Sequence, residues 1–344
     1  MEALHGVILA AGEGTRLAPL TRYRPKPLVP LAGRPLLAGA FDALHAAGVR
    51  RVGLNAFHLG DQVAAAFADD PDVVVVTEDT LQGTGGGVRG IAAALPTGTL
   101  VVINGDALFD FPLAPLLAAH RAAGALGTLA LRVVPPDAPF GRVGVDATGA
   151  LHRIAEVEGP DADRLPLRFG AFTGVQIIEP ALVAALPPGP GDILRTAWKA
   201  LLARRAPLQG VFVPPTSGWF DVGTPARYLA AHRAILAGDL ATSHLPPADA
   251  EGRRVHPDAR VHPDARLVGP CAVLPGATVG PGARVGPYAF LDQGARVDGA
   301  FEHAVAWPDV HVPGDLAHAI ALPGEVVRLP QPDAAETLPT PGAS

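Results

Sequence analysis

Two cationic side chains close to a glycine-rich loop are the first candidates for chemistry in this chain. The loop covers Ala11–Arg16 and follows the apolar run Gly6–Ala10, which predicts a buried strand. Because the loop has little side-chain bulk, its backbone N–H groups can approach phosphate oxygens closely. Arg16 offers a planar fork of donors, and Lys26, held between two prolines, offers a point charge. Together these features suit the orientation of a polyphosphate.

Two aspartates from distant parts of the chain are candidate metal ligands. Asp106 follows the apolar run Leu100–Ile103, and Asp221 stands just before a predicted helix that includes Tyr228. Alone, either aspartate is more often a turn or helix-cap residue than a ligand. Mg²⁺ favours a few carboxylates together with phosphate oxygens and water. Beside a phosphate-binding loop, the pair Asp106 and Asp221 therefore predicts a Mg²⁺ site.

Alternating apolar and amphipathic segments predict the scaffold that positions these residues. Strands are expected over 7–10, 51–55, 73–77 and 100–104. Helices are expected over 35–47, 59–67, 87–95 and 113–123. This alternation is typical of a mostly parallel sheet covered by helices on both faces, which binds ligands beyond the carboxyl ends of its strands. The residues at that edge are Leu9–Gly12, Asn55, Glu78 and 104–106.

A six-residue repeat distinguishes the C-terminal part of the chain. An aliphatic residue recurs every six positions from Val255 to Val297, and a small residue follows four places after most of them. Such a repeat stacks aliphatic side chains on the faces of a triangular coil and is typical of a left-handed parallel β-helix. Between two and three coils are expected over 255–302. The predicted organisation is a catalytic domain over 1–236, a linker over 237–254, the β-helix over 255–325 and a disordered tail over 326–344.

Composition limits the classes to which the chain can belong. It has 344 residues, 49% of them hydrophobic and 17% charged, so two domains with sizeable cores are expected. The formal net charge of −6 and the lack of a basic run argue against a nucleic-acid partner. The single cysteine, Cys271, excludes an intrachain disulfide. No secretion signal or membrane-spanning stretch is recognisable, which favours a cytoplasmic protein with no membrane partner.

The glycine-rich loop and its surroundings also carry a family resemblance. The string Gly-x-Gly-Thr-Arg-Leu-x-Pro-Leu-Thr at 12–21, followed by Pro-Lys-Pro-Leu-Val-Pro at 25–30, resembles the signature of sugar-1-phosphate nucleotidyltransferases. These enzymes make a nucleotide-sugar and pyrophosphate from a nucleoside triphosphate (NTP) and a sugar 1-phosphate. The resemblance implies a Rossmann-like, GT-A-like fold for 4–235, with the repeat as a common appendage. It further implies that Arg16 and Lys26 are catalytic and that Asp106 and Asp221 hold Mg²⁺.

The same resemblance implies contacts to both substrates. On the nucleotide side it implies Leu9, Ala10, Ala11, Gly12, Gly14, Thr15, Glu78, Gly83 and Thr84. On the sugar side it implies Gly141, Glu158, Thr173 and Gly174, with Glu156 as an alternative to Glu158. Many members have a lysine where Gly159 stands. Either Arg142 or Arg153 replaces that lysine, or the sugar phosphate is held differently.

Two features of the loop after the third predicted strand indicate different nucleobases. Many members have a glutamine where Glu78 stands, and a carboxylate could accept hydrogens from the N1 and N2 edge of guanine, which favours GTP. The triple glycine at 85–87 resembles uridylyltransferases of N-acetylmuramate 1-phosphate, or is a flexible helix entrance. Muramate-type chains usually lack the repeat, whereas mannose-1-phosphate guanylyltransferase-like chains usually carry it. We therefore favour the guanylyl type and keep the uridylyl type as the alternative.

Two other classes of protein compete with this interpretation. Left-handed β-helices often host acetyl transfer from a thioester cofactor, but the repeat here is short, and we expect it to serve homo-oligomerisation or regulation. A non-catalytic regulatory subunit tends to lose the residues of the site. This chain keeps all four of them: Arg16, Lys26, Asp106 and Asp221.

Overall fold

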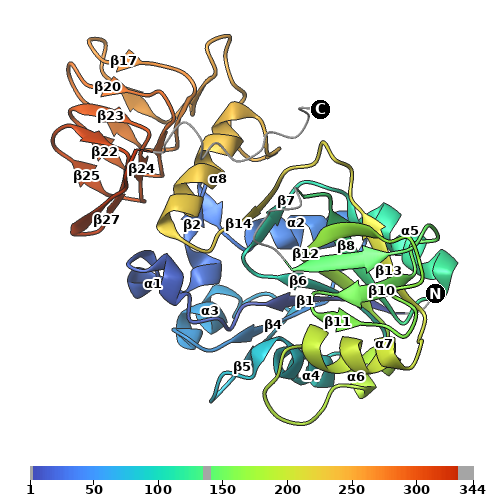
Figure 1. The fold of residues 1–344 in the computed structure, drawn as a ribbon. Coiled ribbons are helices and arrows are strands. Elements are labelled where there is room, and N and C mark those ends of the chain that lie inside the picture. The colour runs from blue at the N-terminus through green and yellow to red at the C-terminus, as the bar shows by residue number, and fades with distance from the viewer. Residues whose placement is uncertain (1–2, 135–140, 332–344) are drawn as a thin grey trace. The chain divides into compact units, whose positions relative to one another are not determined.

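The computed structural model describes residues 3–134 and 141–331, and the chain forms two compact units (Figure 1). The first unit contains Met1–Glu13, Leu37–Ala107 and Phe111–Ser217. The second contains Gly14–Leu36, Leu108–Asp110 and Gly218–Ser344. The glycine-rich loop is therefore divided between the units after Glu13. The linear boundaries expected at 236 and 254 stay a prediction.

A ten-stranded sheet forms the centre of the first unit. The order of its parallel half is β6 (Thr99–Asn104), β1 (Leu4–Leu9), β4 (Val52–Ala56) and β5 (Val73–Thr77). Leu9 pairs with Asn104, and Ala56 pairs with Thr77, so the carboxyl ends of these strands share one edge. The predicted α/β fold with a parallel sheet is confirmed. These strands were recognisable because strands buried on both faces are nearly continuous apolar runs.

Beyond β6 the sheet continues with antiparallel neighbours. The long strand β12 (Arg168–Ile178) pairs antiparallel with β6, with β8 (Gly127–Arg132) and with β9 (Arg142–Val145). The sheet is completed by β10 (Leu151–Ile154), β11 (Val157–Glu158) and β13 (Leu208–Phe212). The register of β12 shifts between Phe172 and Gln176, around Gly174, whose φ of 86° favours glycine.

Helices connect and cover the strands of this sheet. They are α2 (Ala38–Ala46), α3 (Gly60–Ala66), α4 (Gly83–Ala94), α5 (Leu113–Ala123), α6 (Pro180–Ala184), the π-helical turn η3 (Leu194–Trp198) and α7 (Lys199–Ala203). The helix expected to start at Gly87 starts at Gly83 instead, so the triple glycine lies inside α4. Apolar residues of helices and strands, including Ile91, Leu129 and the fully buried Trp198, form one core in this unit.

The second unit begins with the remainder of the signature segment. It contains η1 (Thr15–Leu17), α1 (Leu20–Tyr23), η2 (Lys26–Leu28) and the short ribbon of β2 (Pro30–Leu31) and β3 (Arg34–Pro35). Later segments add β7 (Ala107–Phe109), β14 (Trp219–Asp221) and α8 (Pro225–Ala237). Thr224 caps α8, because its side chain accepts the N–H of Arg227.

Three stacked sheets of parallel strands form a β-helix in the second unit (Figure 1). The first face contains β15 (Arg253–Val255), β18 (Cys271–Val273), β21 (Ala289–Leu291), β24 (Val305–Ala306), β27 (Ala319–Leu322) and the antiparallel β28 (Glu325–Arg328). The second contains β16 (Arg260–Val261), β19 (Thr278–Val279), β22 (Arg296–Val297) and β25 (His311–Val312). The third contains β17 (Arg266–Leu267), β20 (Arg284–Val285), β23 (Ala300–Glu302) and β26 (Leu316–Ala317). The β-helix predicted from the repeat is confirmed.

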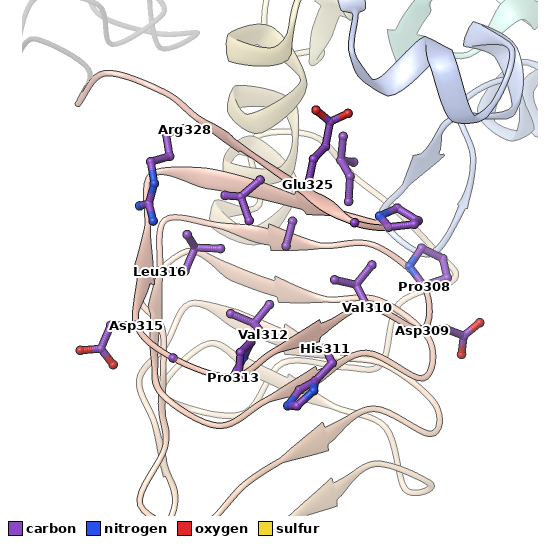
Figure 2. A pocket seen from close by; sticks show the side chains of 16 residues that line it. Pro308, Asp309, Val310, His311, Val312, Pro313, Asp315, Leu316, Glu325 and Arg328 are labelled. Carbon is purple, nitrogen blue, oxygen red and sulfur yellow. The ribbon is translucent and has the colours of Figure 1, made fainter.

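The β-helix continues beyond Glu302, where the segment expected to form two to three coils ends. Cys271 pairs with Ala289, 18 positions later, but Phe290 pairs with Val305, only 15 positions later. Shorter coils break the six-residue period, so the repeat disappears from the sequence while the coil continues. At its C-terminal end the last coil borders a hollow of about 590 Å³ (Figure 2). The last three residues of β28, 326–328, fall in the segment expected to be a disordered tail, which is a correction because they pair with β27. Residues 332–344 of that segment lie outside the described residues.

A single apolar core runs through the second unit. It includes Leu17 and Leu20 from the signature segment, Tyr228 from α8, and Phe290 and Trp307 from the β-helix, all of them fully or almost fully buried. The signature segment is therefore packed in one core with the β-helix. Among the described helices, none is long and apolar enough to cross a membrane.

Candidate active site

In the first unit, a chain of hydrogen bonds connects the ends of three parallel strands. Asn55 Oδ1 accepts the backbone N–H of Ala10 at 2.7 Å and that of Ala11 at 3.3 Å. Asn55 Nδ2 donates to Glu78 Oε1 at 2.7 Å, and Glu78 Oε2 accepts the N–H of Gln82 at 2.9 Å. Asn55 and Glu78 are buried, at 3% and 9% exposure. Both carboxylate oxygens of Glu78 thus already accept hydrogen bonds from the protein.

The glycines at the start of α4 make close contacts with neighbouring backbone. A Cβ on Gly83, which has a φ of 66°, would lie 2.7 Å from the carbonyl oxygen of Gly191. The N–H of Gly85 donates to the same oxygen at 2.8 Å. Thr84 Oγ1 accepts the N–H of Ile193 at 2.9 Å, which ties the helix start to this segment. Gly83 and Gly85 therefore lie where a side chain would require the segment around Gly191 to shift.

Asp106 follows the last residues of β6 and is half-buried. The N–H of Gly105 donates to the carbonyl of Leu9 at 2.9 Å, and a Cβ on Gly105 would lie 2.8 Å from that oxygen. Gly174 packs against the same strand end, because its Cβ would lie 3.1 Å from Asn104 Nδ2. The first unit thus brings Leu9, Asp106 and Gly174 to one edge of the sheet.

The remaining sugar-side candidates differ in their burial and in their contacts. The buried hydroxyl of Thr173 donates to the carbonyl of Ala130 at 3.0 Å, whereas Gly141 is exposed. The exposed Glu158 forms an ion pair with Arg153. Arg142 instead stacks over the Phe169 ring, with its guanidinium carbon 4.3 Å from the ring centre. Of the two arginines considered as replacements for the family lysine, only Arg153 therefore contacts the proposed sugar-binding glutamate.

Gly159, where many members have lysine, is buried against the backbone. Its N–H donates to the carbonyl of His152 at 2.7 Å. A Cβ there would lie 3.1 Å from that oxygen and 3.3 Å from Leu202 Cδ1. A larger side chain would therefore need the surrounding structure to shift, which accounts for the glycine.

In the second unit, the signature segment folds back on itself at Gly14. Gly14 has a φ of 65°, and its carbonyl accepts the hydroxyl of Thr21 at 3.1 Å. A Cβ on Gly14 would lie 2.7 Å from Thr21 Cγ2 and 3.1 Å from Lys26 Cβ. The glycine therefore lets the loop that carries Thr15 and Arg16 pass directly beside Lys26.

Arg16 and Asp221 lie beside the same glycine of the second unit. A Cβ on Gly223 would be 3.3 Å from Asp221 Oδ1 and 3.5 Å from Arg16 Nη2. Asp221 Oδ2 accepts Arg227 Nη1 at 3.0 Å. Asp221 Oδ1 is buried and, among the described residues, has no hydrogen-bond partner. A buried carboxylate oxygen without a donor is a fitting ligand for a cation.

The described residues do not contain a group of three or more His, Cys, Asp and Glu side chains that could hold a metal on its own. Mg²⁺ commonly uses only one or two carboxylates and completes its shell with substrate phosphates and water. The donor set expected from the sequence, Asp106 and Asp221, is of that kind. The unpartnered Oδ1 of Asp221 is the structural feature that fits it.

Three features of the site had no specific signal in the sequence. The sequence predicts that Asn55 lies at the sheet edge, but not its contacts with Ala10 and Glu78, which belong to other parts of the chain. Gly191 was missed because its contact with α4 spans about a hundred residues. Gly223 was visible only as a turn residue after Asp221.

The sheet, with a glycine-rich loop after its first strand, defines an α/β protein of Rossmann type. Residues 5–238 match the family described as nucleotidyl transferase, and the chain belongs to that family. A mannose-1-phosphate guanylyltransferase of Mycobacterium tuberculosis is 33% identical over 238 residues, covering 67% of this chain and 64% of the relative. A UTP–glucose-1-phosphate uridylyltransferase of Synechocystis is 27% identical over 261 residues, covering 71% and 66%. A bifunctional protein GlmU of Leifsonia xyli is 38% identical over 156 residues, covering 44% and 32%. The chain thus spans less than two thirds of the length of these relatives.

Proposed function

We propose that this protein transfers a nucleotidyl group from an NTP to a sugar 1-phosphate and releases pyrophosphate. The observation that carries the proposal is that Arg16 and Asp221 both lie beside Gly223, while Lys26 lies next to Gly14 in the signature segment. A fork of donors, a point charge and a carboxylate with a buried free oxygen are the groups that this reaction needs. Family membership supports the same reaction.

The chemistry is a direct displacement at the α-phosphorus of the NTP by the phosphate of the sugar 1-phosphate. The attacking phosphate is already ionised, so neither a general base nor a covalent intermediate is required. Catalysis then depends on positioning and on neutralisation of charge. In this proposal Arg16 holds the leaving pyrophosphate, and Lys26 stabilises the charge that builds on the α-phosphate.

Asp106 and Asp221 are the proposed ligands of Mg²⁺. When bound, the metal shields the triphosphate so that an anionic nucleophile can approach it. The ion pair with Arg227 orients the Asp221 carboxylate and leaves Oδ1 as the ligand atom. Arg227 would therefore hold the carboxylate through Oδ2, the oxygen that is not proposed to bind the metal.

The two substrates are assigned to different parts of the first sheet and its loops. The nucleotide is proposed to contact Leu9, Ala10, Ala11, Gly12, Gly14, Thr15, Glu78, Gly83 and Thr84. The sugar is proposed to contact Gly141, Glu158, Thr173 and Gly174. The sugar phosphate would meet Arg153, whose guanidinium already binds Glu158. This pair offers a cation for the phosphate next to an acceptor for the sugar hydroxyls.

GTP and mannose 1-phosphate are the favoured substrates. The Mycobacterium tuberculosis relative, named a mannose-1-phosphate guanylyltransferase, supports this choice. The Synechocystis relative, named a UTP–glucose-1-phosphate uridylyltransferase, supports the alternative of uridylyl transfer to a hexose 1-phosphate such as glucose or N-acetylmuramate 1-phosphate. We also propose that the β-helix supports a homo-oligomer, because β25 and β26 end their sheets with no further strand paired to them among the described residues.

A matrix of the common NTPs against several sugar 1-phosphates, read as pyrophosphate release with Mg²⁺, tests the function. We expect one NTP to dominate and Lys26→Ala to lower its turnover by about 100- to 1000-fold. Arg22→Ala is the matched control, because it removes an exposed cation from the same segment. Acetyl transfer from acetyl-CoA to an amino sugar without pyrophosphate release would favour the acyltransferase instead. Nucleotide-sugar binding without turnover would favour a regulatory subunit.

A further inference from the structure

The hydrogen-bond chain from Ala10 to Gln82 has a fixed direction from donor to acceptor. Two backbone N–H groups, of Ala10 and Ala11, donate to the Asn55 carbonyl oxygen. The Asn55 amide then donates to one oxygen of Glu78, while the N–H of Gln82 donates to the other. Glu78 thus faces donors on both sides, and a carboxylate is the side chain that satisfies both without a donor of its own.

The chain of bonds connects the two loops that flank the proposed nucleotide pocket. Ala10 and Ala11 begin the phosphate loop after β1, and Gln82 precedes the first residue of α4. Asn55 belongs to β4, the strand between β1 and β5. The side-chain pair Asn55–Glu78 therefore sets the distance between the phosphate loop and the loop assigned to the base.

Gly87 packs closely against this buried pair. A Cβ on Gly87 would lie 2.5 Å from Asn55 Nδ2 and 3.4 Å from Glu78 Oε1. Both side chains are buried, so a lost partner cannot be replaced by bulk water. Because Gly87, the third glycine of the triple, has no side chain, Asn55 and Glu78 can occupy the space beside it.

We propose that Glu78 is a positioning residue, which acts on the nucleotide through Asn55 and the Ala10–Ala11 backbone and does not itself read the base. The inference rests on the proposed function and specifies how that site is held. It also implies that Glu78 does not select the nucleobase, because both of its carboxylate oxygens accept hydrogen bonds from Asn55 and Gln82. This role replaces both the direct nucleotide contact proposed for Glu78 above and the acceptance of guanine hydrogens expected from the sequence.

A reversal of the hydrogen-bond polarity tests the inference. Glu78→Gln places an amide N–H₂ against either the Asn55 amide or the Gln82 N–H, both of which are donors. Asn55→Asp places a second carboxylate against Glu78, where Asn55 Nδ2 and Glu78 Oε1 are 2.7 Å apart in the wild type. In the double variant N55D/E78Q the new aspartate accepts from Ala10, Ala11 and the new glutamine amide. The glutamine oxygen accepts from Gln82. Every bond of the chain is then restored with the opposite polarity between the two side chains.

The assays are binding of GTP, UTP, ATP and CTP by calorimetry, and steady-state kinetics with the best pair of substrates. We expect each single variant to weaken NTP binding and raise its KM by about 10- to 100-fold, with kcat and the KM for sugar 1-phosphate little changed. We expect the double variant to return to within about 3-fold of wild type. The ratio of GTP to UTP binding should stay constant across all four proteins. Thermal unfolding of each protein checks that they fold.

Three results would overturn the inference, and they differ in what else they affect. A double variant no better than Glu78→Gln shows that the hydrogen-bond chain does not carry the effect, and a Glu78→Gln protein whose GTP-to-UTP ratio changes about 10-fold shows direct base reading by Glu78. Both results leave the proposed function intact. Wild-type protein that binds none of the four triphosphates and forms no nucleotide-sugar overturns the proposed function together with this inference.

Discussion

Two buried groups of the second unit are expected to give the stability of this protein opposing pH dependences. His232 on α8 is 1% exposed, and burial lowers its pKa to about 4. Its Nε2 accepts the N–H of Ala32 at 3.1 Å, so protonation there would also break a hydrogen bond. Asp292 in the β-helix is 2% exposed, and burial raises its pKa to about 6, with Asp309 adding to the rise and Arg24 opposing it.

The two groups change stability in opposite directions over the same pH range. As the pH falls from 6.5 to about 4, the unfolded chain protonates His232 and the folded one does not, so stability is lost. As the pH falls from about 6 to 3.8, the folded chain protonates Asp292 before the unfolded one, so stability is gained. Each effect amounts to about 3 kcal/mol at full extent, because one pKa unit is worth about 1.4 kcal/mol. In the wild type they largely cancel.

Variants that remove one group expose the effect of the other. Asp292→Asn should stabilise the unit relative to wild type at about pH 7, and this advantage should fall by about 2 to 3 kcal/mol at about pH 4.5. His232→Gln should show the reverse trend, with its deficit largest at neutral pH and smaller in acid. Asp264→Asn, an exposed aspartate in the same β-helix, is the matched control and should show no such trend.

Because the chain has a single cysteine, labelling of that cysteine measures the stability of the second unit specifically. Cys271 is fully buried in the β-helix core, and burial raises the pKa of its thiol to about 11. A pyridyl disulfide that reacts in acid would therefore label it only after the β-helix opens. Labelling against urea concentration then gives the stability of the unit at each pH. Differences between variant and wild type that do not change with pH would refute the reasoning.

Two further predictions concern the metal site and the link between the signature segment and the β-helix. Asp221→Asn should raise the Mg²⁺ concentration for half-maximal activity by about 10-fold or more, because the buried Oδ1 loses its charge. The exposed Asp239→Asn should not, and an unchanged Mg²⁺ titration of Asp221→Asn would exclude Asp221 as a ligand. Tyr228→Phe should destabilise the second unit by about 2 kcal/mol, because the Pro30 carbonyl and the Trp307 indole N–H would both lose a buried partner. If Cys271 of Tyr228→Phe were labelled at the same urea concentration as in the wild type, this expectation would be contradicted.

The parallel half of the sheet could be predicted because its strands carry their own signal. The strand Val73–Thr77 was predicted with its exact bounds and the other three within one to three residues, and strand-helix alternation predicted a shared carboxyl edge. The start of α4 was missed, because glycine is a poor helix former and the Gly83–Gly87 run resembles a loop. Tertiary contacts with Gly191 and Asn55 require those glycines, and no local pattern reports such contacts.

The site was predictable where a motif carries it and not where distant segments meet. The signature proposed Arg16 and Lys26 as candidates, and the position of strand ends proposed Asp106; their roles stay predictions. The occupation of both Glu78 oxygens depends on Asn55, a residue 23 positions away on another strand. The later coils of the β-helix lack the six-residue repeat for a related reason, since their 15-residue spacing keeps the fold but not the period.

The most direct test of the central proposal follows the α-phosphate. The protein is incubated with Mg²⁺, a sugar 1-phosphate and NTP labelled at either the α- or the γ-phosphorus. We predict that the α-label appears in a nucleotide-sugar and the γ-label in pyrophosphate, in equal amounts and only when the sugar 1-phosphate is present. An α-label that remains in nucleoside phosphates for every NTP and sugar 1-phosphate tried, while the protein is folded, would contradict nucleotidyl transfer to a sugar phosphate.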